Sequence, residues 1–155
     1  MKTPSQTVGP YYVIGLVRRD DSYLVEHTDP ASVRLIGELL DGQGAPIADG
    51  MIEIWDGERW ARSATDSEGR FSFTVTKPTT RPGETPRFDV FVFARGLLRH
   101  QLTRIYFPDE PNEVDPVFAS LSDEQRETLL GVTEGGSLRF DIRMQGDRAT
   151  VFFEH

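Results

Sequence analysis

Short apolar runs separated by turn-forming residues constrain the fold of this chain more than any other feature of its sequence. Within most runs apolar and polar side chains alternate, which fits β-strands, and the runs are too short for typical helices. The segments 41–44, 66–69 and 145–147 lie between runs and are rich in Asp and Gly, which supply turns and positive φ. The sequence therefore predicts an all-β protein, an antiparallel β-sandwich. The predicted strands are residues 33–40, 51–55, 71–76, 88–94, 103–107, 137–144 and 150–154.

Only one segment has a helical pattern. Residues 121–130 begin near Ser122, whose hydroxyl can cap a first turn, and Gln125 stands where it completes a capping box. The 155 residues suffice for one hydrophobic core, and the content of 37% hydrophobic and 27% charged residues is typical of globular proteins. We expect a single domain over residues 1–155, with one short peripheral helix and with residues 1–12 as an N-terminal arm outside the sheets.

The predicted strand 88–94 is apolar on both faces, so both faces require cover. It is either a central strand between two layers of its own domain, or one of its faces contacts a partner chain, because exposed aromatic surface is typical of interfaces. The similar apolar run 151–153 slightly favours a partner. One face carries Phe88, Val90 and Val92, and the other carries Phe91 and Phe93.

Composition excludes several classes of function. The chain has no cysteine, so disulfides, thiolate metal sites and cysteine nucleophiles are impossible. The net charge is -8 and the basic residues are scattered, which argues against a nucleic-acid partner. No run approaches the roughly 18 apolar residues of a membrane span, and residues 1–10 do not resemble a signal peptide. A cytoplasmic location is therefore expected.

The sequence contains no local motif for a metal or a catalytic group. His27, His100 and His155 are far apart, without spacing that would place two imidazoles on one ion, and each is interpreted as a surface or loop histidine. Neither the serine-hydrolase elbow nor a dinucleotide-binding glycine motif is present. The residues alone therefore predict an all-β domain with possible partner surfaces and no self-contained catalytic centre.

The four tyrosines are candidate metal ligands, because phenolate oxygen suits ferric iron. Tyr106 lies in an apolar strand and is predicted to be a core residue with a satisfied hydroxyl. Tyr11 and Tyr12 lie in the N-terminal arm, and an arm with two aromatic residues is expected to pack on something. A self-sufficient iron site built from Tyr11, Tyr12, His27 or His100 is the least favoured interpretation.

Several motifs, taken together, resemble the α chains of the protocatechuate 3,4-dioxygenase family, which are intradiol ring-cleaving dioxygenases. The N-terminal Thr-Pro-Ser-Gln-Thr-Val-Gly-Pro-Tyr at residues 3–11 carries the resemblance most clearly, together with Phe-Val-Phe-Ala-Arg-Gly at residues 91–96. The resemblance spans nearly the whole chain and implies the intradiol β-sandwich fold. Further matching stretches are residues 52–55, 103–107, 139–146 and 150–153.

The resemblance also implies that this chain binds no iron. The family's catalytic β chains hold Fe(III) with two tyrosines and two histidines, the latter in a His-X-His pair, but here Arg87 and Asp89 stand at the matching places. The tyrosine that precedes this pair would fall near Thr79 or Thr80, and the segment for the other is absent after Trp55. By this resemblance the cofactor belongs to a partner β subunit in a hetero-oligomer.

The resemblance assigns the α chain a place in the wall of the partner's substrate pocket. The matching residues are Thr7, Gly9, Pro10, Tyr11 and Arg104. The implied reaction inserts both atoms of O2 into 3,4-dihydroxybenzoate and gives 3-carboxy-cis,cis-muconate. A guanidinium suits a substrate that carries a carboxylate.

Two alternatives remain open from the sequence. Arg104 can instead form an ion pair with a carboxylate of its own chain, such as Asp109. The chain can also be a metal-free β-sandwich that binds another protein or ligand, which the short connection after Trp55 would suit.

Overall fold

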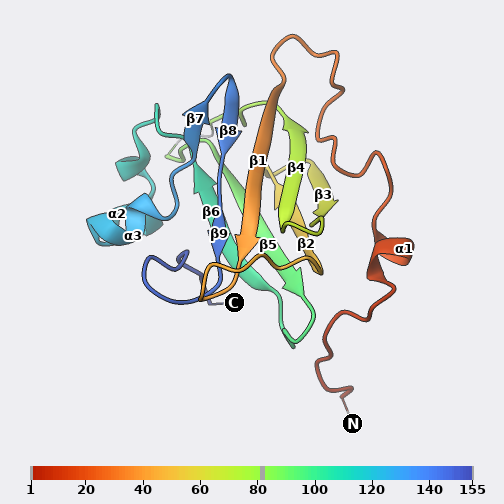
Figure 1. Ribbon diagram of the computed structural model, residues 1–155. Helices are drawn as coiled ribbons and strands as arrows, with labels where there is room; N and C mark the ends of the chain where they lie inside the picture. The colour runs from red at the N-terminus through yellow and green to blue at the C-terminus, as the bar shows by residue number, and fades with distance from the viewer. Residues whose placement is uncertain (1, 81–82, 155) are drawn as a thin grey trace.

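Two β-sheets face each other across a shared apolar core, as the alternating runs of the sequence predict (Figure 1). The computed structural model describes residues 2–80 and 83–154. One sheet has the strand order β4-β1-β8-β7, with β9 paired further along β1, and the other has the order β3-β2-β5-β6. The strands are β1 (Val33–Leu40), β2 (Gly50–Trp55), β3 (Trp60–Ala64), β4 (Arg70–Val75), β5 (Arg87–Ala94), β6 (Gln101–Tyr106), β7 (Val132–Glu134), β8 (Ser137–Arg139) and β9 (Ile142–Arg143).

The predicted β-sandwich is confirmed, and the sheet that contains β1 is mixed rather than antiparallel. β1 pairs antiparallel with β4 but parallel with β8 and β9. A parallel neighbour is possible because a long connection separates β1 from β8. The single strand predicted over 137–144 is divided, since the Glu38 N–H donates to Oδ1 of Asp141 at 3.0 Å rather than to a ladder carbonyl.

The other sheet is antiparallel throughout, and it contains a strand that the sequence did not reveal. β3 pairs with β2, where Trp55 lies opposite Trp60. Its inward residues Ala61 and Ser63 are small and lack the β-branched or aromatic character that marks a strand. β7 was also missed, and the predicted strand 150–154 is reduced to one bridge between Leu102 and Phe153.

The core lies between the sheets, and the face of β5 that carries Phe88, Val90 and Val92 points into it. The side chains from this face are fully buried, whereas Phe91 and Phe93 on the other face are half-buried and pack against the ring of His100. The core is formed by β5 residues Phe88, Val90 and Val92, β2 residues Ile52 and Ile54, β1 residues Leu35 and Leu39, and β4 residues Phe71, Phe73 and Val75.

Short helices lie at two opposite sides of the sandwich, with α1 on one side and α2 and α3 together on the other (Figure 1). The helix predicted within 121–130 is α3, and its capping box of Ser122 and Gln125 is present. The expectation of one helix is too low, because the others are too short for a periodic signal. The helices are α1 (Tyr12–Leu16), η1 (Asn112–Val114), α2 (Pro116–Ala119) and α3 (Asp123–Glu127). Among the described residues, no helix has the length and apolar character needed to cross a membrane.

The Ser122→Ala substitution is expected to lower the free energy of unfolding by about 1 kcal/mol, because the Gln125 N–H loses its side-chain acceptor at the start of α3. Chemical denaturation followed by circular dichroism would measure the change. The matched control is Ser67→Ala, an exposed serine in the turn 66–69, which should stay close to wild type. Equal stability of wild type and Ser122→Ala would contradict the contribution of the cap.

Candidate functional site

An ion-pair network covers part of the outward face of the β5–β6 hairpin. Cross-strand pairing places Arg87 opposite Tyr106 and Asp89 opposite Arg104. Arg104 donates from Nε to Oδ1 of Asp89 at 3.1 Å, and from Nη1 to the Tyr106 hydroxyl at 3.1 Å. Asp115, which precedes α2, joins both strands, since its Oδ2 lies 3.4 Å from Nη1 of Arg87 and 3.4 Å from Nη1 of Arg104.

Asp115 holds this network against helix α2. Its side chain is only 5% exposed, and its Oδ1 accepts the Val117 N–H at 2.8 Å as the helix N-cap. Its Oδ2 accepts the Tyr106 hydroxyl at 3.1 Å. One buried carboxylate therefore caps a helix, accepts the hydrogen bond of a buried phenol and pairs with two guanidinium groups, whose second negative charge comes from Asp89. The Asp-Pro sequence at 115–116 is a recognisable helix start and could have revealed the cap, although not the ion pairs.

Tyr106 is fully buried and hydrogen-bonded, as the sequence predicted. Burial raises the pKa of Tyr106 from 10.0 to about 12, and the nearby guanidinium of Arg104 opposes this shift. The folded state therefore holds the phenol proton of Tyr106 more tightly than the unfolded state does. The contribution of this proton to the free energy of unfolding is fully present below pH 10.0 and is lost as the pH rises toward about 12.

Wild type is expected to show a tyrosinate absorbance step near pH 12, and the Tyr106→Phe variant is expected to lack it. The stability of wild type should fall over that interval with a steeper slope than that of the variant, since the variant has no phenol at position 106 to ionise. Ultraviolet titration and denaturation at several alkaline pH values would measure both. Tyr23→Phe, an exposed tyrosine, is the control that should retain the step. Retention of the step in Tyr106→Phe would contradict the assignment.

The side chains at the places of the family's iron ligands do not fit a ferric ion. The guanidinium of Arg87 is cationic and has donors only, and the Asp89 carboxylate pairs with Arg104. One surface pocket of about 230 Å³ is lined by Arg87 and Asp89 together with Thr79 and Trp55. The structure thus brings together the positions that the family resemblance matched to the iron ligands. Over residues 2–80 and 83–154, no group of three or more His, Cys, Asp or Glu side chains is arranged to hold a metal.

The histidines and the second arm tyrosine lie apart from one another. The ring of His27 packs near Tyr23 at 6.0 Å, that of His100 lies against the phenylalanines of β5, and His155 is outside the described residues. The Tyr12 hydroxyl donates to the Gly50 carbonyl at 2.9 Å, and burial, followed by the charge of Asp49, raises its pKa. A raised pKa disfavours the phenolate form that an iron ligand requires.

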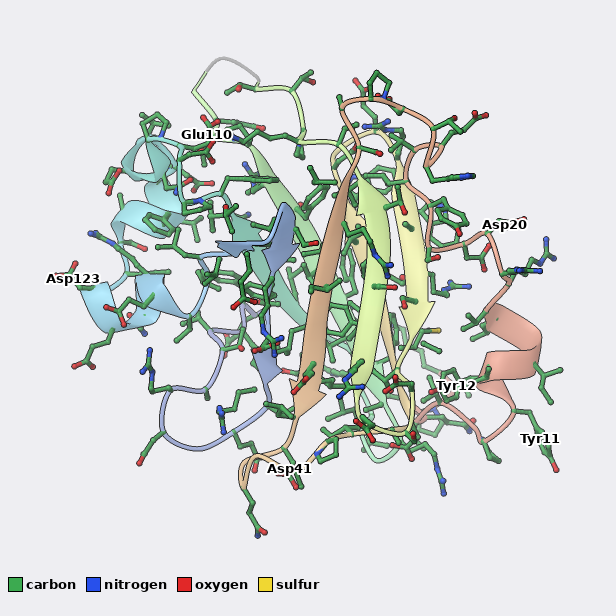
Figure 2. All side chains as sticks on the ribbon, turned by 45° about the horizontal axis from the view of Figure 1, so that its top comes forward. Tyr11, Tyr12, Asp20, Asp41, Glu110 and Asp123 are labelled. Atoms are coloured by element: carbon green, nitrogen blue, oxygen red, sulfur yellow. The ribbon has the colours of Figure 1, made fainter. Side chains whose placement is uncertain are left out.

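The N-terminal arm is attached to the sandwich while part of it stays exposed. Thr7 Oγ1 donates to the Ala94 carbonyl at 3.3 Å and accepts the Gly96 N–H at 2.8 Å. Tyr12 is 6% exposed and Tyr11 is 76% exposed, and Figure 2 shows Tyr11 pointing away from the sheets and Tyr12 lying toward them. The expectation that the arm packs on something is thus met on its own chain through Thr7 and Tyr12.

The five residues matched to the partner's pocket do not form one site within this chain. Thr7 lies at the Ala94 end of β5, whereas Arg104 lies opposite Asp89, five residues earlier on that strand. At the rise of a β-strand the two positions are about 16 Å apart. Arg104 does form ion pairs within its own chain, although not with Asp109, which pairs with Lys77 at 2.7 Å.

Solved structures share this fold with low sequence identity. The dioxygenase domain of a dioxygenase carbohydrate-binding protein fusion from Streptomyces sp. SirexAA-E superposes with a TM-score of 0.64 and 22% identity, over 93% of this chain and 98% of that one. Catechol 1,2-dioxygenase from Pseudomonas arvilla C-1 gives a TM-score of 0.58 and 20% identity, over 80% of this chain and 55% of that one. The sandwich is therefore that of the intradiol dioxygenases.

Sequence comparison is more specific. No family model matches the chain. The protocatechuate 3,4-dioxygenase alpha chain of Burkholderia cepacia is 34% identical over an alignment of 193 positions, gaps included. The alignment covers 99% of this chain and 97% of the relative. The alpha chain of Pseudomonas putida is 33% identical, and the alignment covers 99% of this chain and 96% of the relative. The beta chain of Burkholderia cepacia is 26% identical, and the alignment covers 81% of this chain and 70% of the relative. The chain belongs to the family of protocatechuate 3,4-dioxygenase alpha chains.

Proposed function

We propose that this chain is the iron-free alpha subunit of a protocatechuate 3,4-dioxygenase and that it contributes to the substrate pocket of an iron-holding beta subunit. The substrate would be 3,4-dihydroxybenzoate, cleaved with O2 to 3-carboxy-cis,cis-muconate. The observation that carries the proposal is the similarity to two alpha chains over nearly their whole length. The network of Arg87, Asp89, Arg104 and Asp115 supports an alpha role, because ion pairs stand where a catalytic chain needs iron ligands.

The exposed apolar surface of the arm and α1 supports a partner chain. Ile14 is 81% exposed and Tyr11 is 76% exposed, and Val13 and Leu16 beside them are also exposed. Large apolar side chains clustered on one surface are typical of protein interfaces. In this proposal Gly9, Pro10 and Tyr11 face the pocket of the beta subunit, and this surface packs against that subunit.

Arg104 would bring positive charge to the carboxylate of the substrate. Two of its nitrogens are used by Asp89, Tyr106 and Asp115, while its Nη2 makes no hydrogen bond to any described residue. One donor edge is thus left for a ligand, and the ion pairs fix the plane of the guanidinium. Iron bound by the partner would activate the catechol toward O2, and this chain would orient the substrate and exclude water.

Co-expression with a larger homologue that carries the His-X-His pair would test the proposal. The two chains should co-purify, iron should be present in the complex, and oxygen uptake should be faster with protocatechuate than with catechol. Stoichiometric iron in this chain purified alone would contradict it, as would an equally active beta homologue that needs no alpha chain. The alternative of a metal-free binding module predicts no effect of this chain on turnover, and no feature of residues 2–80 and 83–154 favours it. The cytoplasmic location stays a prediction, which fractionation of the native cells would check.

A further inference from the structure

Two separate motifs of the sequence are in direct contact. Thr7 belongs to the N-terminal motif, and Ala94 and Gly96 belong to the Phe-Val-Phe-Ala-Arg-Gly motif, 87 and 89 residues away. The Thr7 hydroxyl acts as donor to one and as acceptor from the other, so both functions of the hydroxyl are used. Gly96 has φ +90°, a conformation that disfavours side-chain-bearing residues and that presents its N–H to the arm.

A second attachment follows five residues later on the arm. The buried Tyr12 hydroxyl donates to the carbonyl of Gly50 at 2.9 Å. Gly50 and Ala94 are direct cross-strand partners on β2 and β5. Both ends of the segment 8–11 are therefore hydrogen-bonded to one cross-strand pair, which lies at the end of the two central strands of this sheet.

Between these attachments the backbone is short and constrained. The Tyr12 N–H donates to the Gly9 carbonyl at 3.2 Å, and Pro10 has a fixed φ, so few conformations are open to the segment. Tyr11 remains exposed at its end. A segment ordered before binding loses less conformational entropy when a partner contacts it.

We propose that Thr7 and Tyr12 are positioning residues that clasp the arm to the β2–β5 pair and present Gly9, Pro10 and Tyr11 in an ordered conformation. This inference rests on the proposed function, and it changes one expectation from the sequence. Thr7, expected to line the partner's pocket, acts through the neighbouring arm residues, because its hydroxyl is already bonded within its own chain.

The test compares Thr7→Val with Thr7→Ser in the full chain and in the co-expressed complex. Valine keeps the shape of threonine but removes the hydroxyl, whereas serine retains it. In the free chain the Gly96 amide should exchange with solvent about two- to tenfold faster in Thr7→Val, the range expected for one hydrogen bond. In the complex the KM for protocatechuate should rise by a similar factor while kcat changes little. Thr7→Ser should restore both values.

Matched variants separate the clasp from general effects on the arm. Thr3→Val changes another exposed arm threonine whose hydroxyl makes no hydrogen bond to a described residue, and it should behave as wild type. Tyr12→Phe removes the second attachment and should raise the KM independently of Thr7. Nuclear magnetic resonance of the 17.5 kDa chain would measure exchange at the Gly96 amide.

The outcomes are distinct. Equal Gly96 exchange in wild type and Thr7→Val would overturn the clasp whatever the activity. Faster exchange with an unchanged KM in an active complex would overturn its positioning role. An inactive complex of the wild-type chain would instead refute the proposed function, and the exchange comparison in the free chain would still support or overturn the clasp.

Discussion

The Asp115→Ala substitution is expected to lower the free energy of unfolding by about 3–5 kcal/mol, because removal of one partner leaves buried charges uncompensated. Asp115 is 5% exposed, and its Oδ2 contacts Arg87, Arg104 and the Tyr106 hydroxyl. After truncation Arg104 keeps Asp89, and Arg87 keeps Asp89 and the more exposed Glu84, each at 3.7 Å. Tyr106 loses the acceptor of its buried hydroxyl. The N-cap of α2 is lost as well. Denaturant unfolding at neutral pH would measure the effect.

Two control variants separate these contributions. Asp115→Asn keeps a capping oxygen and a hydrogen-bond acceptor but removes the charge, so its loss should be smaller than that of Asp115→Ala. Asp123→Ala removes a carboxylate that is 95% exposed and pairs with Arg126 at 3.3 Å, and it should cost less than about 1 kcal/mol. If Asp115→Ala lowered the free energy of unfolding no more than Asp123→Ala does, the buried network would contribute no more to stability than one exposed ion pair.

In the reconstituted complex, Arg104→Gln is expected to lower kcat/KM for protocatechuate by about ten- to hundredfold, the effect of losing one charge-assisted hydrogen bond. Catechol lacks the carboxylate, so its kcat/KM should fall much less. The ratio of the two values is the informative measurement, because a purely structural disturbance would reduce both alike. Steady-state oxygen uptake with each substrate would give the ratio.

Arg87→Gln is the matched control for this prediction. Arg87 shares Asp115 and Asp89 with Arg104, and its side chain is similarly buried at 18% exposed against 20%. It is not matched to the substrate pocket, so its substitution should destabilise the chain while the protocatechuate-to-catechol ratio stays unchanged. Parallel losses on both substrates in Arg104→Gln would mean that Arg104 is structural only.

Much of the fold was predictable because strands and caps are local. The alternation in residues 33–40 and 88–94 gave β1 and β5 within one residue, and Ser122 and Gln125 gave the start of α3. β3 was missed because Ala61 and Ser63 carry no strand preference, and its place depends on pairing with β2. The parallel pairing of β8 was missed because a local pattern does not say which distant strand lies alongside.

The sequence alone determined the sandwich and the resemblance to the alpha chains, and it is this resemblance that sets Arg87 and Asp89 against the histidine pair expected in a catalytic chain. Only the tertiary structure decided how these residues are used. It paired Arg104 with Asp115 rather than Asp109, and it attached Thr7 to a hairpin turn almost ninety residues away. The physical reason is that periodicity and capping act over a few residues, whereas ion pairs and clasps depend on which strands the folded chain brings together.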